Sequence, residues 1–194
     1  MSKTPESAIN NSEAHQGKSK PAMTSADVIE LYTQLGNLGV QIWIDGGWGV
    51  DALLGKQTRP HKDLDLAIQQ KDVPNLRELL EARRYRDVKP EIAKPWNFVL
   101  GDDMGHEIDV HVIVLDDQGN GIYGPAENGE MYPAASLTGS GTVNDHRVKC
   151  ISPEWMVKFH SGYELKDTDF KDVSALCEKL GIALPDEYIH FIKD

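Results

Sequence analysis

The chain has 194 residues, of which 40% are hydrophobic, enough for one domain with its own core. Its 31 acidic against 20 basic side chains give a formal net charge of −11, which repels phosphate backbones and argues against nucleic acid as the main partner. Cys150 and Cys177 are too few for a disulfide framework, and no apolar run reaches the roughly 18 residues of a membrane span, so we expect a cytoplasmic protein with reduced thiols.

The first regular pattern begins at Thr24. Residues 1–22 are rich in Ser, Asn and Lys and have no apolar stretch, so we expect a disordered tail and not a secretory signal. After Thr24 the apolar residues follow a helical period. Residues 40–44 then alternate with a period of two, which predicts a strand, and the strand ends at the two glycines Gly46 and Gly47.

A short helix is expected after this glycine turn, beginning near Trp48 and ending at Gly55. Gly46 and Gly47 let backbone N–H groups approach a ligand closely, and the start of the helix adds its positive end. The segment therefore indicates an anion site. Its glycine spacing is neither that of a P-loop nor that of the G-x-G-x-x-G dinucleotide fingerprint.

Two aspartates stand one residue apart in the next expected strand, DLDLAI, residues 63–68. Because side chains alternate along a strand, Asp63 and Asp65 point to the same side and the apolar residues to the other. Two carboxylates about 7 Å apart raise each other's pKa unless a cation lies between them. Carboxylate oxygens are the ligands that Mg²⁺ takes, so the pair predicts a magnesium site.

A third carboxylate is available in the strand expected at residues 106–115, HEIDVHVIVL. Asp109 shares one face of this strand with Glu107 and His111, and on a strand next to the first pair it would complete a two-metal site. The stretch is not a zinc motif, because H-E-x-x-H requires its histidines one helical turn apart, and His106 and His111 follow a strand period.

The remaining segments predict further helices and strands. Asp72 begins an amphipathic helix, residues 96–101 read as a strand, and residues 116–145 are rich in Gly, Asn, Pro and Ser, which indicates loops with a short hairpin. Residues 147–151 return to a strand, and Ser152 caps a helix. The expected core face of that helix is Trp155, Met156, Phe159 and Tyr163. Because helices come last, we expect an α/β or α+β sheet with a C-terminal helical cap.

A glycine turn, a short helix and D-x-D on a strand resemble the nucleotidyltransferase superfamily typified by DNA polymerase beta. WIDGGWGVDALLGKQTRPHKDLDL is most similar to its antibiotic branch, the aminoglycoside adenylyltransferases and especially the small lincosamide nucleotidyltransferases. EIDVHVI resembles the segment with that group's third aspartate, and CISPEWMVKFHSGYELKDTD resembles its helical tail. The resemblance implies a polymerase-beta-like mixed sheet flanked by helices, with a nucleotidyltransferase domain at residues 23–151 and a C-terminal helical region at residues 152–194.

The resemblance also implies a role for each candidate residue. Asp63 and Asp65 would bind Mg²⁺, and Asp109 would bind metal, take the proton of the acceptor hydroxyl, or do both. The residues implied to bind the nucleotide are Gly46, Gly47, Trp48, Arg59 and His61. The wider superfamily has a serine in the turn where this chain has Trp48, and the antibiotic branch shares that tryptophan.

The implied function is transfer of a nucleoside monophosphate, AMP from ATP, to a hydroxyl of a small molecule. The acidic surface suits a cationic antibiotic, a lincosamide first and an aminoglycoside second. The alternative is a nucleotide-binding regulatory module, for example of a toxin system, but a pure binder does not need the third aspartate as a base. A metal-dependent phosphohydrolase is a weaker option. We expect a monomer or homodimer without a membrane partner.

Overall fold

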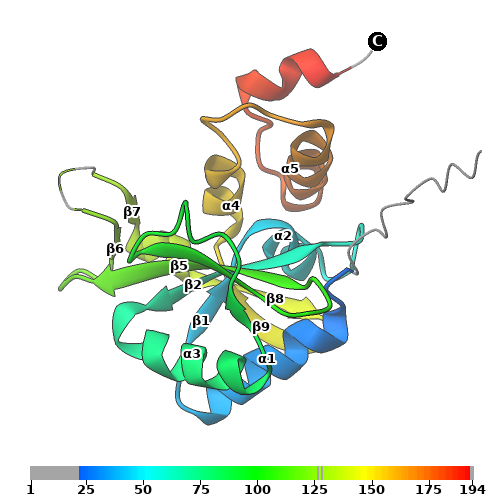
Figure 1. Cartoon of the computed structure of the whole chain (residues 1–194). Helices are drawn as coiled ribbons and strands as arrows, with labels where there is room; N and C mark the ends of the chain where they lie inside the picture. Colours follow the sequence, from blue (N-terminus) through cyan, green and yellow to red (C-terminus); the bar gives the residue numbers. More distant parts are fainter. Residues whose placement is uncertain (1–21, 126, 128, 193–194) are drawn as a thin grey trace, which may run out of the picture.

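The computed structural model describes residues 22–125, 127 and 129–192. The expected tail at residues 1–22 therefore lies outside the described residues, except for Ala22. Within these ranges no helix is long and apolar enough to cross a membrane. A mixed sheet lies between helices on its two faces (Figure 1), so the predicted α/β class is confirmed.

Within the described residues the sheet has nine strands, and its main path follows the order β3-β4-β5-β2-β1-β9-β8. β2 runs parallel to β5 and β1 runs parallel to β9, while the other pairs are antiparallel. β6 pairs with β5, and β7 pairs with β6, so these two strands form an arm beside β5. The strands are β1 Ile42–Ile44, β2 Asp63–Gln69, β3 Arg86–Asp87, β4 Asn97–Gly101, β5 Glu107–Leu115, β6 Gly121–Tyr123, β7 Met131–Tyr132, β8 Gly139–Val143 and β9 His146–Cys150.

The helices divide between the two faces of the sheet. α1 and α3 lie on one face, and α2, α4 and α5 lie on the other (Figure 1). The α-helices are α1 Ser25–Asn37, α2 Gly46–Leu54, α3 Val73–Ala82, α4 Pro153–Phe159 and α5 Asp167–Leu180. Short 3₁₀ helices are η1 Gln70–Asp72, η3 Ala134–Thr138 and η4 Asp186–Phe191.

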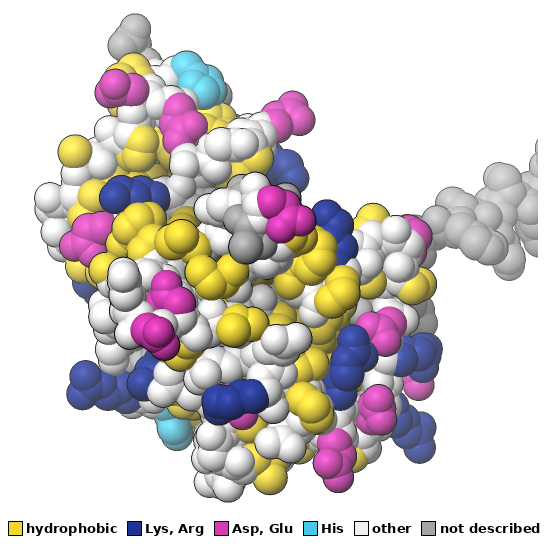
Figure 2. Space-filling model, turned by 90° about the vertical axis from the view of Figure 1, so that its left-hand side faces the viewer, with side chains coloured by type: hydrophobic (Ala, Val, Ile, Leu, Met, Phe, Trp, Pro, Cys, Tyr) yellow, Lys and Arg dark blue, Asp and Glu magenta, His cyan; other side chains and the backbone are white. Residues whose placement is uncertain are grey.

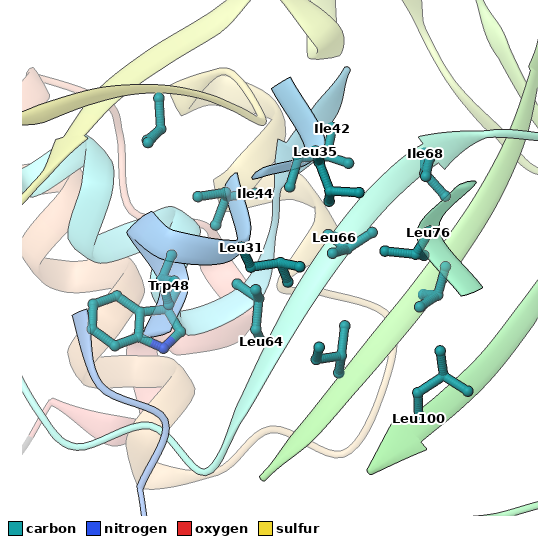
Figure 3. Close-up of a cluster of buried hydrophobic side chains, with 14 of the residues drawn as sticks. Leu31, Leu35, Ile42, Ile44, Trp48, Leu64, Leu66, Ile68, Leu76 and Leu100 are labelled. Atoms are coloured by element: carbon teal, nitrogen blue, oxygen red, sulfur yellow. The ribbon is translucent and has the colours of Figure 1, made fainter. Parts of the chain in front are cut away.

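A hydrophobic cluster fills the space on each side of the sheet. Leu64, Leu66 and Ile68 of β2 belong to the first cluster, with residues of α1 and α3 (Figure 3). Trp43 and Ala67 point to the opposite face and join the second cluster, which includes residues of α4 and α5. The alternation of β2 therefore directs its aspartates to the face of the C-terminal helices. The domain boundary after residue 151 stays a prediction.

Three local expectations are corrected. Gly46 and Gly47 form the first turn of α2 and not a turn before it, because the Asp45 carboxylate accepts the Gly46 N–H at 2.8 Å and caps the helix. Within residues 116–145 the antiparallel pair of β6 and β7 confirms the expected short hairpin, while η3 and β8 stand where loops were expected.

The helix expected after Ser152 is shorter than predicted. The helix that begins after Ser152 ends at Phe159, so Tyr163 lies outside it and is 48% exposed. Gly162, just before Tyr163, has a φ of 80°, a left-handed conformation that cannot continue a helix. The expected core face of α4 therefore stops one turn earlier.

Candidate active site

Carboxylates of β2 and β5 come together on the face of the sheet that carries the C-terminal helices. The parallel register of the two strands pairs Asp65 with Asp109 and Asp63 with Glu107. One ligand atom each of Asp65, Asp109 and His111 lies within 4.8 Å of the others. Oxygen and imidazole nitrogen atoms at this spacing form a candidate metal site.

The electrostatics of Asp65 fit a bound cation. Burial raises its pKa to about 8, and the negative charges of Asp63, Asp45 and Asp109 act in the same direction. Ionisation of Asp65 is therefore unfavourable as long as no cation lies between these carboxylates. A divalent cation bound there would lower the pKa of Asp65 again. Asp63 lies at the exposed start of β2, one step along the same strand face.

Four polar side chains that the sequence reading did not select surround the aspartates. Asn97 Nδ2 donates a hydrogen bond of 2.9 Å to Asp109 Oδ1, and His111 Nε2 lies 3.6 Å from the same oxygen. The hydroxyl of Tyr132 lies 2.6 Å from His111 Nδ1 and donates to Asp45 Oδ2 at 3.0 Å. Burial and Asp45 raise the pKa of Tyr132 well above its ordinary value, so its phenol stays a neutral donor.

The first turn of α2 lies directly against these groups. A Cβ on Gly46 would overlap the carboxylate of Asp65, and Gly46 has a φ of 53°. A Cβ on Gly47 would overlap the imidazole of His61 and lie 2.9 Å from Arg59 Nη2. Both positions therefore need glycine, because the helix backbone comes within van der Waals contact of the candidate site.

A cavity of about 930 Å³ opens beside Asp65 and His111. Its outer walls come from the β6–β7 arm and from α4 and the segment after it. Hydrophobic side chains also gather on the face that carries β6 and β7 (Figure 2). Away from the carboxylates, the charged lining residues are Glu130 and Lys158. The aromatic and apolar lining residues are Tyr123, Met131, Tyr132, Pro133, Trp155, Phe159 and Tyr163.

The family model described as aminoglycoside-2''-adenylyltransferase matches residues 27–176, which is most of the chain. The chain belongs to this family. Nucleotidyl transfer is the chemistry of the family, and it uses a nucleotide co-substrate and a divalent metal.

Individual relatives agree with the family assignment. A lincosamide resistance protein of Staphylococcus haemolyticus is 30% identical over 158 residues, which cover 79% of this chain and 94% of that protein. The crystal structure of the lincosamide antibiotic adenylyltransferase LnuA, lincomycin-bound, has a TM-score of 0.71 at 29% identity and covers 84% of this chain and 100% of LnuA. ANT(2'')-Ia with adenylyl-2''-tobramycin shares the fold, with a TM-score of 0.65 at 20% identity over 81% of this chain and 89% of that one. The predicted nucleotidyltransferase fold and antibiotic branch are confirmed.

Two of the side chains expected at the nucleotide are buried in this member of the family. The indole of Trp48 is 1% exposed and belongs to the core (Figure 3). His61 is 2% exposed, and its Nε2 lies 2.5 Å from Asp51 Oδ2, so it packs beneath α2. Arg59 remains 34% exposed while Asp172 of α5 holds its guanidinium. Trp48, in the first turn of α2, and His61, in the segment between α2 and β2, therefore pack against the turn from inside the protein.

We expect Gly46→Ala to lower the transfer rate of this enzyme at least about 100-fold. The new methyl group would displace the Asp65 carboxylate, and the positive φ would add about 1–3 kcal/mol of strain. Steady-state kinetics and thermal unfolding would measure both effects. The matched control is Gly36→Ala in α1, where a Cβ meets no atom within 4 Å. It should keep its activity and gain up to about 1 kcal/mol of stability. Normal turnover of Gly46→Ala would contradict the close packing.

We expect the metal-free enzyme to be destabilised by Asp65 as the pH rises. The pKa of Asp65 is raised from 3.8 to about 8 in the folded state, so the folded state holds this proton more tightly than the unfolded state. Its stabilising contribution is complete below pH 4 and is lost as the pH rises toward 8.

The measurement is a series of melting temperatures in EDTA for the wild type and Asp65→Asn. Because a tenfold change in proton affinity corresponds to about 1.4 kcal/mol, the Asn variant should gain several degrees over the wild type between pH 4 and pH 8. A difference that stays constant over this range would contradict the assigned environment.

Proposed function

We propose that the chain is a Mg²⁺-dependent enzyme that transfers AMP from ATP to a hydroxyl of an antibiotic. The observation that carries this proposal is the pairing of Asp65 with Asp109 on neighbouring strands, with Asp65 in the wall of a largely aromatic cavity of about 930 Å³. The family match and the relatives named for lincosamides and aminoglycosides support the reaction class. They do not favour the alternative of a regulatory module without turnover.

In this proposal Asp63, Asp65 and Asp109 bind the metal. A divalent ion held there would neutralise charge on the phosphates and on the acceptor oxygen. Because Asn97 occupies Asp109 Oδ1 with a hydrogen bond of 2.9 Å, Oδ2 is left to take the proton of the acceptor hydroxyl. The acceptor oxygen then attacks the α-phosphorus in line, and pyrophosphate leaves.

The triphosphate lies against the start of α2 in this proposal. Gly46 and Gly47 present backbone close to the phosphates, and the helix adds its positive end. Arg59 contributes a cation from the elbow after α2. Asp172 fixes that guanidinium through contacts of 2.7 Å and 3.2 Å and raises the pKa of Arg59 through this hydrogen bonding. Trp48 and His61 serve the site by holding the turn.

A lincosamide fits the cavity better than an aminoglycoside does. An aminoglycoside carries several cationic amines and would require several carboxylates along its length. The cavity wall of described residues away from the aspartates offers one acidic side chain, Glu130, and places Lys158 in the same lining. A lincosamide carries a single amine on a larger apolar frame, which the aromatic side chains can cover.

A mass-spectrometric screen tests this function. The purified chain is incubated with Mg²⁺ and each of ATP, GTP, CTP and UTP against a panel of lincosamides and aminoglycosides. We expect the mass increment of an adenylyl group on a lincosamide with ATP. ATP cleavage without any acceptor would indicate a phosphohydrolase instead, and the absence of any nucleotidylated product across the panel would refute the proposal.

A further inference from the structure

We propose that His111 is a direct ligand of the metal ion, and that Asp45 and Tyr132 hold its imidazole in the orientation that ligation requires. This inference rests on the proposed function in one respect, because it concerns the same divalent metal. It adds a nitrogen ligand to the carboxylates that the sequence indicated.

The imidazole of His111 lies at the edge of the carboxylate pair. His111 follows Asp109 by two residues on β5, so both side chains point to the same side of the sheet. Nε2 of His111 is 3.6 Å from Asp109 Oδ1, and the ligand atoms of His111, Asp109 and Asp65 lie within 4.8 Å of one another. An ion about 2.1 Å from each ligand holds atoms up to about 4.2 Å apart. Movement of less than about 1 Å would therefore close the site.

The hydrogen bonds of Tyr132 determine which nitrogen of His111 is free. Its hydroxyl donates its single hydrogen to Asp45 Oδ2 at 3.0 Å. His111 Nδ1 lies 2.6 Å from the same hydroxyl oxygen, so Nδ1 must be the donor in that contact and carry the ring proton. In a neutral imidazole the other nitrogen then has the lone pair. This nitrogen, Nε2, is the one that faces Asp109.

Hydrogen bonds connect Asp45 to Tyr132 and Tyr132 to His111, and both Asp45 and Tyr132 are fixed in place by the fold. Asp45 is buried and caps α2, because its Oδ1 accepts the Gly46 N–H at 2.8 Å while its Oδ2 accepts from Tyr132. Tyr132 is buried too and belongs to β7, in the wall of the cavity. A carboxylate behind an imidazole is the usual way to orient a metal-binding histidine. Here Tyr132 stands between the carboxylate of Asp45 and the imidazole of His111. Because Tyr132 also lines the cavity, it connects the proposed antibiotic pocket to the metal site.

Manganese binding to the full chain tests the proposal without any reaction. The protein is stripped with EDTA and titrated with Mn²⁺ alone, and electron paramagnetic resonance reports the affinity and any coupling to a ligand nitrogen. We expect nitrogen coupling in the wild type. His111→Ala should lose the coupling and bind Mn²⁺ at least tenfold more weakly. Tyr132→Phe should keep the nitrogen coupling but weaken Mn²⁺ binding about 10–100-fold, the usual cost of removing a group that hydrogen-bonds a metal ligand.

Two matched variants control for side effects. His146→Ala removes an exposed histidine of β9. Tyr123→Phe removes a hydroxyl of the same cavity that makes no hydrogen bond with the described residues. Both should bind Mn²⁺ like the wild type.

Two results would overturn His111 as a ligand: a wild-type spectrum without nitrogen coupling, or Mn²⁺ affinity that is unchanged or increased in His111→Ala. Unchanged affinity in Tyr132→Phe would overturn the positioning role. Because no nucleotide or antibiotic is present, a negative outcome here concerns the ligand set. The mass-spectrometric screen tests the transfer reaction separately.

Discussion

Asp65→Asn is expected to lower kcat/KM for nucleotidyl transfer by at least about 10³-fold and to leave the protein folded. The variant removes one negative charge from the candidate metal site, and losing about 4 kcal/mol of transition-state stabilisation corresponds to that factor. The fold should survive because Asn has nearly the same shape and relieves the repulsion by Asp63, Asp45 and Asp109. Product formation by mass spectrometry and thermal unfolding without metal would measure the two effects.

The control for this variant is Asp117→Asn, which makes the same chemical change at an exposed position in the turn between β5 and β6. It should keep wild-type kinetics. If Asp65→Asn retained kcat/KM within tenfold of the wild type, a metal held by this carboxylate would no longer explain catalysis.

The local pattern of the sequence was sufficient to orient the first two aspartates. DLDLAI alternates, and the structure has Leu64, Leu66 and Ile68 in the core with the aspartates on the other face. The period of two also made Asp109 a candidate, but which strand lies beside β2 depends on long-range pairing, which the local pattern does not give. The parallel register that aligns Asp65 with Asp109 is a property of the whole sheet.

The groups around the aspartates were harder to find. His111 carried a usable signal, because it shares a strand face with Asp109. Asn97 and Tyr132 carried none. Asn97 reaches the site because β4 pairs with β5 and aligns it with His111, and Tyr132 arrives on β7, which the sequence indicated only as part of a loop region. Contacts between distant segments cannot be read from a local period.

Composition misled the reading of residues 116–145 for a physical reason. Gly139 and Gly141 belong to β8, GSGTV, although glycine usually indicates a turn. A Cβ on Gly139 would meet the backbone oxygen of Ile151, and a Cβ on Gly141 would overlap the backbone of Ala52 in α2. Gly141 allows β8 to pack closely against α2, and Gly139 allows it to approach the backbone at the end of β9. The burial of Trp48 was not predicted either, since α2 begins two residues earlier than expected and turns the indole inward.

Asp109→Asn is expected to lower kcat at least about 10³-fold while the affinity for ATP stays within a few-fold of the wild type. Removing a general base alone costs about 10²–10⁴-fold, and Asp109 is proposed to contribute to metal binding as well. Nucleotide affinity should survive because the backbone of α2 and Arg59 are unchanged. The substituted amide can still offer an oxygen to Asn97 Nδ2, which bonds Asp109 Oδ1 at 2.9 Å in the wild type. Single-turnover kinetics and calorimetric ATP binding separate the two quantities.

Glu107→Gln provides the matched comparison, because Glu107 lies on the same face of β5 two residues before Asp109 and is paired with Lys89 at 2.7 Å. Removing its charge should change kcat by no more than a few-fold, since Lys89 already offsets that charge. If both variants slowed the reaction equally, the effect would come from the summed negative charge of the strand face. A normal kcat in Asp109→Asn would exclude Asp109 as the base for the acceptor hydroxyl. His111 would then be the candidate base in its place, because its Nε2 lies 3.6 Å from Asp109 Oδ1.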